Sequence, residues 1–119
     1  MKLKLSDTRG WVIKSVSGLS LESEKVTINC DKGSIVLEHW HDCCEQVFVE
    51  DFDGDPEALV GATIADFRED TSDLDDSYYG ISMHTFYNLI TDKQDAMIRW
   101  YGESNGYYSI NVSVSVTPH

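Results

Sequence analysis

The last third of the chain carries the pattern that most restricts the fold. From Ser109 to Val116, a serine or asparagine alternates with an apolar residue without a break. This period of two is typical of a strand that has one face against a core. Just before it, Asn105-Gly106 has the residue types that a type I′ turn requires. We therefore predict a β-hairpin that joins a strand over 96–101 to the strand over 109–116.

This predicted hairpin contains a conflict of register. A two-residue turn at Asn105-Gly106 would place Trp100 opposite Asn111, on the serine face of the last strand. An extra residue in one strand swaps its faces, so a β-bulge at Gly102 would remove the mismatch. We expect that bulge. Without it, the serine face must pack as well, against the short helix described next or against a second sheet.

Strand and turn signals recur through the rest of the chain. Apolar and β-branched residues predict strands over 11–21, 25–30, 34–40, 46–52, 62–68 and 78–91. Asp55-Pro56 starts and Gly61 stops a predicted short helix near 56–60. Residues 69–77 are acidic and lack apolar periodicity, which predicts a mobile loop. We expect one α+β domain over 1–119, or a small sandwich or barrel, mostly antiparallel, with six or more strands and one short helix.

Negative charge is concentrated in one segment. The net charge is −12, and residues 42–76 hold thirteen of the twenty-one acidic residues but a single basic one, Arg68. Direct nucleic-acid binding is not expected, because it needs basic patches. Such a segment is either a solvated surface or a site for a partner with a basic surface. Carboxylates of the predicted loop and tyrosines of the predicted hairpin tip supply the candidate partner-binding residues, which are Glu69, Asp70, Asp73, Asp75, Asp76, Tyr107 and Tyr108.

Residues suited to chemistry are crowded into the run 38–46. If the backbone stays extended, two histidines, one cysteine and Glu45 share one face, which suits zinc; Cys30 or His84 would then be a fourth ligand. If the backbone turns at Asp42, then Asp42 and Glu45 have the spacing of a capping box, and the two cysteines lie in one tight turn. The candidate zinc ligands are His39, His41, Asp42, Cys43, Cys44, Glu45 and His84.

The same residues also have simpler explanations. Free cysteines are common in protein cores, and histidines commonly satisfy hydrogen bonds. Adjacent cysteines bridge only with strain, so we expect no disulfide between Cys43 and Cys44. A cysteine nucleophile with His41 as its base is a further alternative. The sequence contains no phosphate loop, dinucleotide fingerprint or Ser-His-Asp motif, so it predicts no organic cofactor and no particular reaction.

The sequence also bears on the compartment. Residues 1–7 are charged and no apolar stretch follows them, so we expect no secretory signal. No apolar run approaches the length of a membrane span. Three cysteines, an odd number, argue against a disulfide framework. We therefore expect a cytoplasmic protein with reduced thiols and no membrane partner.

Two stretches together resemble a family of small phage and prophage proteins. The first starts with His41-Asp42-Cys43-Cys44-Glu45, and the second is Trp100-Tyr101-Gly102-Glu103-Ser104-Asn105-Gly106-Tyr107-Tyr108-Ser109. Members of that family carry a Gln-Asp-Cys-Cys-Glu motif and a late Trp-Tyr-Gly-x-Ser-Asn-Gly-Tyr-Tyr-Ser motif. This chain has His41 where the family usually has Gln, and His84 where it usually has Trp. The resemblance therefore supports His39 and the Asp-Cys-Cys-Glu core rather than those two histidines.

The resemblance implies a phage or mobile-element context but no established function. Small acidic proteins of this type often act by blocking a host protein. We expect a non-enzymatic inhibitor of a host defence nuclease such as a CRISPR effector, acting in the bacterial cytosol, with a structural zinc site. The acidic segment would complement the basic nucleic-acid channel of such a target. A zinc-dependent hydrolase and a structural phage protein are the alternatives.

Overall fold

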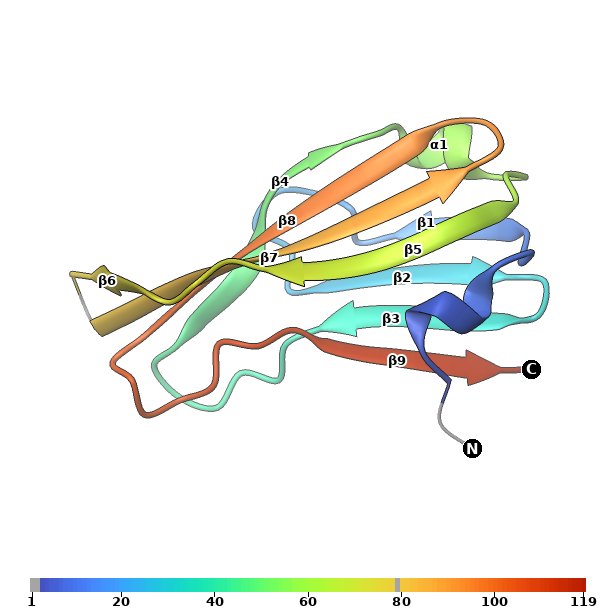
Figure 1. Ribbon diagram of the computed structural model, residues 1–119. Helices are drawn as coiled ribbons and strands as arrows, with labels where there is room; N and C mark the ends of the chain where they lie inside the picture. Colours follow the sequence, from blue (N-terminus) through green and yellow to red (C-terminus); the bar gives the residue numbers. More distant parts are fainter. Residues whose placement is uncertain (1–2, 79) are drawn as a thin grey trace.

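In a computed structural model, which describes residues 3–78 and 80–119, nine strands form two antiparallel sheets that lie face to face (Figure 1). The strands are β1 (Ile13–Ser17), β2 (Lys25–Cys30), β3 (Gly33–Glu38), β4 (Gln46–Asp53), β5 (Ile64–Thr71), β6 (Asp75–Ser77), β7 (Gly80–Thr91), β8 (Asp95–Ser104) and β9 (Ser113–Pro118). One sheet has the order β1-β2-β3-β9. The other has the order β4-β8-β7-β5, and β6 pairs with β7 beyond it. The predicted class, mostly antiparallel β with one short helix, is confirmed, and the architecture is a sandwich.

The two sheets share one core. Alternate residues of most strands point between the sheets, as in Ile35 and Leu37 of β3, which are fully buried. Trp100 of β8 and Tyr87 of β7 are the largest side chains buried from the other sheet. The 3-10 helix η1 (Leu5–Thr8) adds the buried side chain of Leu5. In the described part of the chain, no helix is long and apolar enough to span a membrane.

The predicted helix forms as α1 (Pro56–Leu59). Asp55 caps it, because its Oδ1 accepts a hydrogen bond from the Glu57 N–H at 3.0 Å. Gly61 follows with a φ of +86°, a conformation that glycine adopts without steric cost. The predicted β2–β3 hairpin is also confirmed, with pairs from Lys25–Glu38 to Asn29–Ser34.

The predicted hairpin at Asn105-Gly106 is wrong. β8 continues to Ser104, and residues 105–112 then cross to the other sheet, where β9 pairs with β3. The Ser104 hydroxyl holds this turn, because it donates to the Tyr108 carbonyl at 2.9 Å and accepts from the Gly106 N–H at 3.0 Å. The alternation in the last strand was interpreted correctly, since its serines face outward and its valines inward.

No bulge forms at Gly102, which pairs in register with both neighbouring strands. A Cβ at this position would lie 2.8 Å from the Ile110 Cβ, so the glycine makes room for the crossing segment. Because β9 is not the partner of β8, the conflict of register does not arise. Trp100 faces the core while the serine face of β9 stays exposed, so the alternative of a packed serine face is wrong too.

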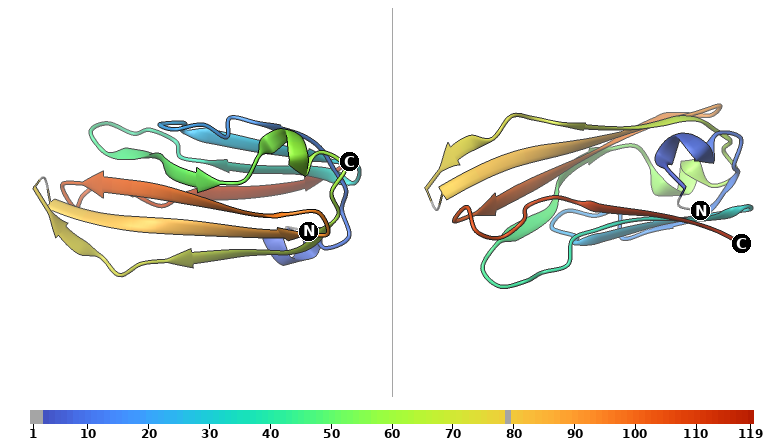
Figure 2. Two further views of the ribbon diagram at one scale, coloured as in Figure 1. Left: turned by 90° about the horizontal axis from the view of Figure 1, so that it is seen from above. Right: turned by 60° about the horizontal axis from the view of Figure 1, so that its bottom comes forward.

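The predicted mobile loop over 69–77 is also wrong over most of its length. β5 extends to Thr71, and β6 covers 75–77; both strands pair with β7. The Tyr87 hydroxyl donates a hydrogen bond to Glu69 at 2.6 Å, and this bond anchors the C-terminal half of β5. Backbone pairing therefore orders a stretch that lacks an apolar pattern. Figure 2 shows that β6 and the start of β7 extend beyond the rest of the sandwich.

Several strand boundaries also differ from the prediction: the strand predicted over 34–40 ends at Glu38, and the strand predicted over 109–116 begins at Ser113. The strand predicted over 11–21 ends at Ser17, because Gly18 turns with a φ of +78° and a Cβ there would overlap the Lys25 carbonyl. The strand predicted over 78–91 begins at Gly80. Tyr79, which was part of that prediction, lies outside the described residues.

Candidate functional site

The run 39–45 connects β3 to β4 through a turn that is fixed by a buried carboxylate. The Glu45 side chain is 1% exposed. Its oxygens accept hydrogen bonds from the Asp42 N–H at 3.1 and 3.2 Å and from the Cys43 N–H at 2.9 Å. The backbone therefore turns at Asp42, the second of the two alternatives left by the sequence. Glu45 reaches back as the acid of a capping box does, although no helix follows.

His39 ties this turn to the segment that crosses from β8 to β9. Its Nδ1 lies 2.9 Å from the Asn111 carbonyl oxygen, and its Nε2 lies 3.0 Å from Glu45 Oε2. Both partners accept hydrogen bonds, so only a ring with a proton on each nitrogen donates both bonds. The His39 side chain is 5% exposed. A buried, charge-assisted contact thus links the two connections between the sheets.

Electrostatics at this turn favour the charged forms of two side chains. Burial alone would raise the pKa of Glu45, but hydrogen bonds from Cys43, His39 and Asp42 outweigh it and lower that pKa to about 2. The pKa of His41 is raised above its usual value, first because its Nε2 lies 2.7 Å from the Cys43 carbonyl oxygen, against a cost of burial. Glu24, 3.5 Å from His41 Nδ1, and Glu45 raise that pKa further.

The structure joins Cys43 and Cys44 in a disulfide, so the prediction that they would not bridge is wrong. Both residues lie in the turn that Glu45 holds, and both are exposed. In this state neither sulfur is a thiolate that would bind a metal or attack a carbonyl. The remaining cysteine, Cys30, is a buried free thiol, and burial, followed by the charge of Asp31, raises its pKa to about 11.

Among residues 3–78 and 80–119, no group of three or more His, Cys, Asp or Glu side chains is arranged to hold a metal ion. Instead, His39 is hydrogen-bonded to Glu45, and His41 Nε2 lies 3.6 Å from Glu45 Oε1. His84 lies elsewhere, on β7, with its Nε2 3.2 Å from Glu50 and its ring 5.5 Å from that of Tyr101. Zinc at the 39–45 turn therefore stays a prediction.

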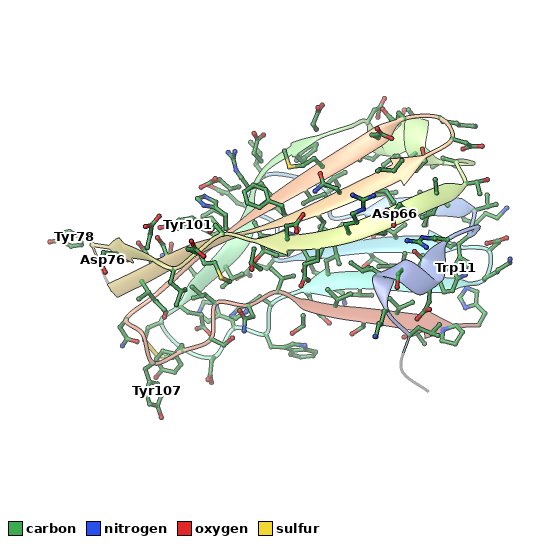
Figure 3. The ribbon with its side chains drawn as sticks, viewed as in Figure 1. Trp11, Asp66, Asp76, Tyr78, Tyr101 and Tyr107 are labelled. Atoms are coloured by element: carbon green, nitrogen blue, oxygen red, sulfur yellow. A yellow bond between two sulfur atoms is a disulfide. The ribbon has the colours of Figure 1, made fainter. Side chains whose placement is uncertain are left out.

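Most of the predicted partner-binding residues lie at one end of the sandwich, which we call the acidic end (residues 73–78 and 105–108). Asp73, Asp75 and Asp76 are exposed there. Both turns adjoin the start of β7, because Ile81 pairs with Asp76 of β6 on one side and with Ser104 of β8 on the other. Figure 3 shows Asp76, Tyr78 and Tyr107 at this end of the molecule.

Two residues of the acidic end were missed from the sequence. Leu74 is 60% exposed and Tyr78 is 93% exposed, beside the three aspartates. Tyr107 is 83% exposed and packs edge-on against the half-buried Tyr108, with 5.0 Å between ring centroids. The signal that could have identified Leu74 is an apolar residue within an acidic run. The end therefore combines exposed apolar side chains with carboxylates.

Other predicted residues are placed differently. Glu69 and Asp70 lie on β5, and the Glu69 carboxylate is engaged by Tyr87. Phe86 lies half-buried on the outer face of the five-stranded sheet, in ring contact with His84. On the same face, Arg99 pairs with Glu50 at 2.8 Å. This face is thus a row of rings crossed by ion pairs rather than part of the core.

Comparison with known proteins gives one match. Residues 9–114 match a family model described as a domain of unknown function, DUF7448. The chain belongs to this family. The DUF7448 domain contains the whole 39–45 turn and the whole acidic end, and the family description names no activity. No curated protein and no solved structure matches the chain.

Proposed function

We propose that this DUF7448 protein is a non-enzymatic binding protein that docks its acidic end on a basic surface of another protein. One observation carries the proposal. Leu74 and Tyr78 are exposed beside Asp73, Asp75 and Asp76 in the chain, and Tyr107 is exposed at the same end of the sandwich. Apolar and aromatic anchors surrounded by charge are the usual composition of a protein interface.

The charge of the molecule supports this docking mode. A net charge of −12 on 119 residues repels nucleic acid and attracts basic surfaces over several ångströms. Complementary potentials raise the rate of association, and salt screens them beyond about 8–10 Å. We expect the carboxylates to speed the encounter and the apolar side chains to hold the complex.

The partner that we propose is a protein whose basic surface binds nucleic acid, such as a CRISPR effector nuclease. Such a surface must be basic because it neutralises phosphates. The acidic end would then compete with nucleic acid for that surface. The phage-type motifs in the sequence support a phage or mobile-element context for this activity, and that context is part of the proposal.

The test is DNA cleavage by a purified CRISPR effector nuclease in the presence of the protein. We expect the wild type to inhibit cleavage, and the triple variant Asp73→Lys, Asp75→Lys, Asp76→Lys to inhibit at least about tenfold less, because like charges now face each other. The control variant Glu22→Lys, Glu24→Lys, Glu57→Lys has the same net charge and should behave almost as the wild type.

Two other results separate the parts of the proposal. Equal loss of inhibition in both triple variants would mean that only net charge matters, and the acidic end would not be the binding surface. If the wild type bound basic proteins through the acidic end but did not inhibit the nuclease, the partner class would be wrong while the docking mode would stand.

A further inference from the structure

The free edges of the two sheets are not alike. An edge strand presents unpaired N–H and C=O groups that another strand can bind, and proteins protect such edges with charges, bulges or covering segments. The edges here are β1 and β9 in one sheet and, in the other, β4 on one side and β5 with the short β6 on the opposite side. Three of them are protected in these ways, and β9 is not.

The edge formed by β1 is covered by the segment that follows α1. The Ile13 N–H donates to the Ala62 carbonyl at 2.9 Å, and the Gly61 N–H donates to the Ile13 carbonyl at 2.7 Å. The register of β1 with β2 also breaks at Lys14, which places a bulge and a charge on this edge. The covering segment and the bulge therefore protect the start of β1.

The edge formed by β4 is covered by the turn between β1 and β2. The Val49 carbonyl accepts from the Glu22 N–H, and the Val49 N–H donates to the Ser23 carbonyl, both at 2.8 Å. The register with β8 breaks at Glu50. A covering turn and a bulge therefore protect β4.

The edge formed by β5 is protected by charge and by a bulge. Its register with β7 breaks at Ala65, and the Ile64 carbonyl accepts from the Gly10 N–H at 2.8 Å. The strand carries four charged residues, which are Asp66, Arg68, Glu69 and Asp70. Charged side chains on an edge oppose pairing with another strand.

By contrast, among the described residues β9 has no bulge, no charged side chain and no backbone hydrogen bond to a covering segment, although Leu3 and Lys4 line a cavity beside its Val114. The register of β9 with β3 is unbroken from Ser113–Glu38 to Pro118–Gly33, and the sequence of β9 contains no charged residue. Within residues 3–78 and 80–119, no hydrogen bond reaches its backbone from outside the sheet. Pro118 lacks an N–H, so it limits pairing at one end and leaves the rest of the edge open.

The hydrogen-bond pattern shows which groups of β9 are free. The His119 N–H donates to the Lys32 carbonyl at 3.0 Å, so that pair is hydrogen-bonded. Hydrogen-bonded pairs occur at every second residue along an antiparallel ladder. The N–H and C=O groups of the odd-numbered residues of β9 are therefore directed toward β3. Val114 and Val116 therefore direct their N–H and C=O groups away from the sheet.

We infer that β9 pairs with β9 of a second copy of this chain, antiparallel about a two-fold axis, so that two four-stranded sheets become one of eight strands. In the register centred on Ser115, Val114 of each copy faces Val116 of the other. All four free N–H groups of these valines then find carbonyl partners. Ser115 faces Ser115 of the second copy in a closely spaced, non-hydrogen-bonded pair, where a small side chain fits.

Two features favour a second copy over an unrelated strand. The strand is complementary to itself, as a two-fold interface requires, because the same two valines donate and accept on both sides. Its sheet is also the less charged one: strands β1, β2, β3 and β9 carry only Lys14, Lys25 and Glu38. Two copies that each bear a net charge of −12 therefore repel each other least at this edge. This inference does not depend on the proposed partner.

Cysteine cross-linking tests the register directly. In a Cys43→Ser, Cys44→Ser background, Ser115→Cys should form a disulfide-linked dimer under mild oxidation, because the two Ser115 positions face each other. Ser113→Cys is the matched control, since residue 113 would face Thr117 of the other copy and should cross-link at least about tenfold more slowly. Equal rates for the two variants would overturn the inferred edge and register.

Sedimentation of the wild-type protein tests the dimer itself. We expect a monomer–dimer equilibrium whose dimer fraction rises with salt, because salt screens the repulsion between the copies. Ser115→Lys should weaken the dimer roughly fivefold or more, since like charges would lie directly opposite, while Ser20→Lys on an exposed turn should not. A wild-type protein that stays monomeric at millimolar concentration and high salt would overturn the inference and leave the edge to a strand of another protein.

Discussion

The two sheets of this sandwich share a core but have very different surfaces. The strands of the four-stranded sheet carry one carboxylate and two lysines. Those of the five-stranded sheet carry ten carboxylates and two arginines, which are Glu50, Asp51, Asp53, Asp66, Glu69, Asp70, Asp75, Asp76, Asp95, Glu103, Arg68 and Arg99.

This difference teaches that the charge is not a requirement of the fold. Both sheets bury the same kinds of side chain, and the four-stranded sheet, which we call the neutral sheet, forms with a single carboxylate on its strands. Surface charge bears on partners and solubility rather than on the fold. We therefore assign the basic partner to the acidic end of the five-stranded sheet, which we call the acidic sheet, and the second copy to the free edge of the neutral sheet.

The largest expected effect tests whether the core is truly shared. Trp100→Ala, from the acidic sheet, should lower the free energy of unfolding by about 3–5 kcal/mol. Leu37→Ala, from the neutral sheet, should lower it by about 2–5 kcal/mol. Urea unfolding followed by circular dichroism should show a single transition in both variants. Two separate transitions would mean that each sheet holds its own core.

The next effect concerns the joint between the sheets, where His39 and Glu45 lie. The pKa of Glu45 falls from 4.5 to about 2 on folding, so its contribution to stability is present above pH 4.5 and is lost as the pH falls toward 2. The pKa of His41 is raised above 6.5, so its contribution is present below pH 6.5 and is lost as the pH rises through the folded value.

These signs predict that the contribution of this turn to stability is greatest between about pH 4.5 and 6.5. Thermal unfolding across this range measures it. Glu45→Gln should remove part of the decrease in stability below pH 4.5. His41→Gln should remove part of the decrease above pH 6.5. If stability fell equally below pH 4.5 in Glu45→Gln and in the wild type, this carboxylate would not stabilise the joint between the sheets.

A smaller effect tests why the acidic stretch after residue 68 is ordered. Tyr87→Phe removes the hydroxyl that donates to Glu69 and should cost about 1–2 kcal/mol. Hydrogen exchange should then rise in 69–71 more than in β2. Glu69→Gln is the paired variant, and the double variant should cost less than the sum of the two. Additive costs would show that the two side chains act independently.

The sequence predicted those elements whose signals are local. The α1 helix follows from Asp55-Pro56, and the β2–β3 hairpin from alternation around a short turn. The Asp42–Glu45 spacing likewise gave the turn that Glu45 forms as one of two alternatives. Each of these depends on residues within a few positions of one another.

The rest depends on contacts between distant residues. β9 pairs with β3 and not with β8, although Asn105-Gly106 is a strong local hairpin signal. The turn after β8 is held instead by the hydrogen bond from the Ser104 hydroxyl to the Tyr108 carbonyl. The order of 69–77 comes from pairing with β7. His39 meets Asn111, which is 72 positions away, so no spacing in the sequence could indicate that contact.

The smallest effect is expected at the cysteines. Cys43→Ser with Cys44→Ser should change the unfolding free energy by less than about 1 kcal/mol, because both side chains are exposed and Glu45 holds the turn. Metal analysis of the same samples checks the zinc prediction. Stoichiometric zinc in the wild type that disappears in the variant, together with a large loss of stability, would show that the turn rearranges around a metal.

The central claim is that the acidic end, rather than the acidic sheet as a whole, is the binding surface. Hydrogen exchange measured with and without a nona-arginine peptide tests it most directly, because acids also line β4 and β5. We predict protection concentrated in 73–78 and 105–108, and its loss in the Asp73→Lys, Asp75→Lys, Asp76→Lys variant. Protection spread evenly along β4 and β5, and unchanged in that variant, would contradict the claim.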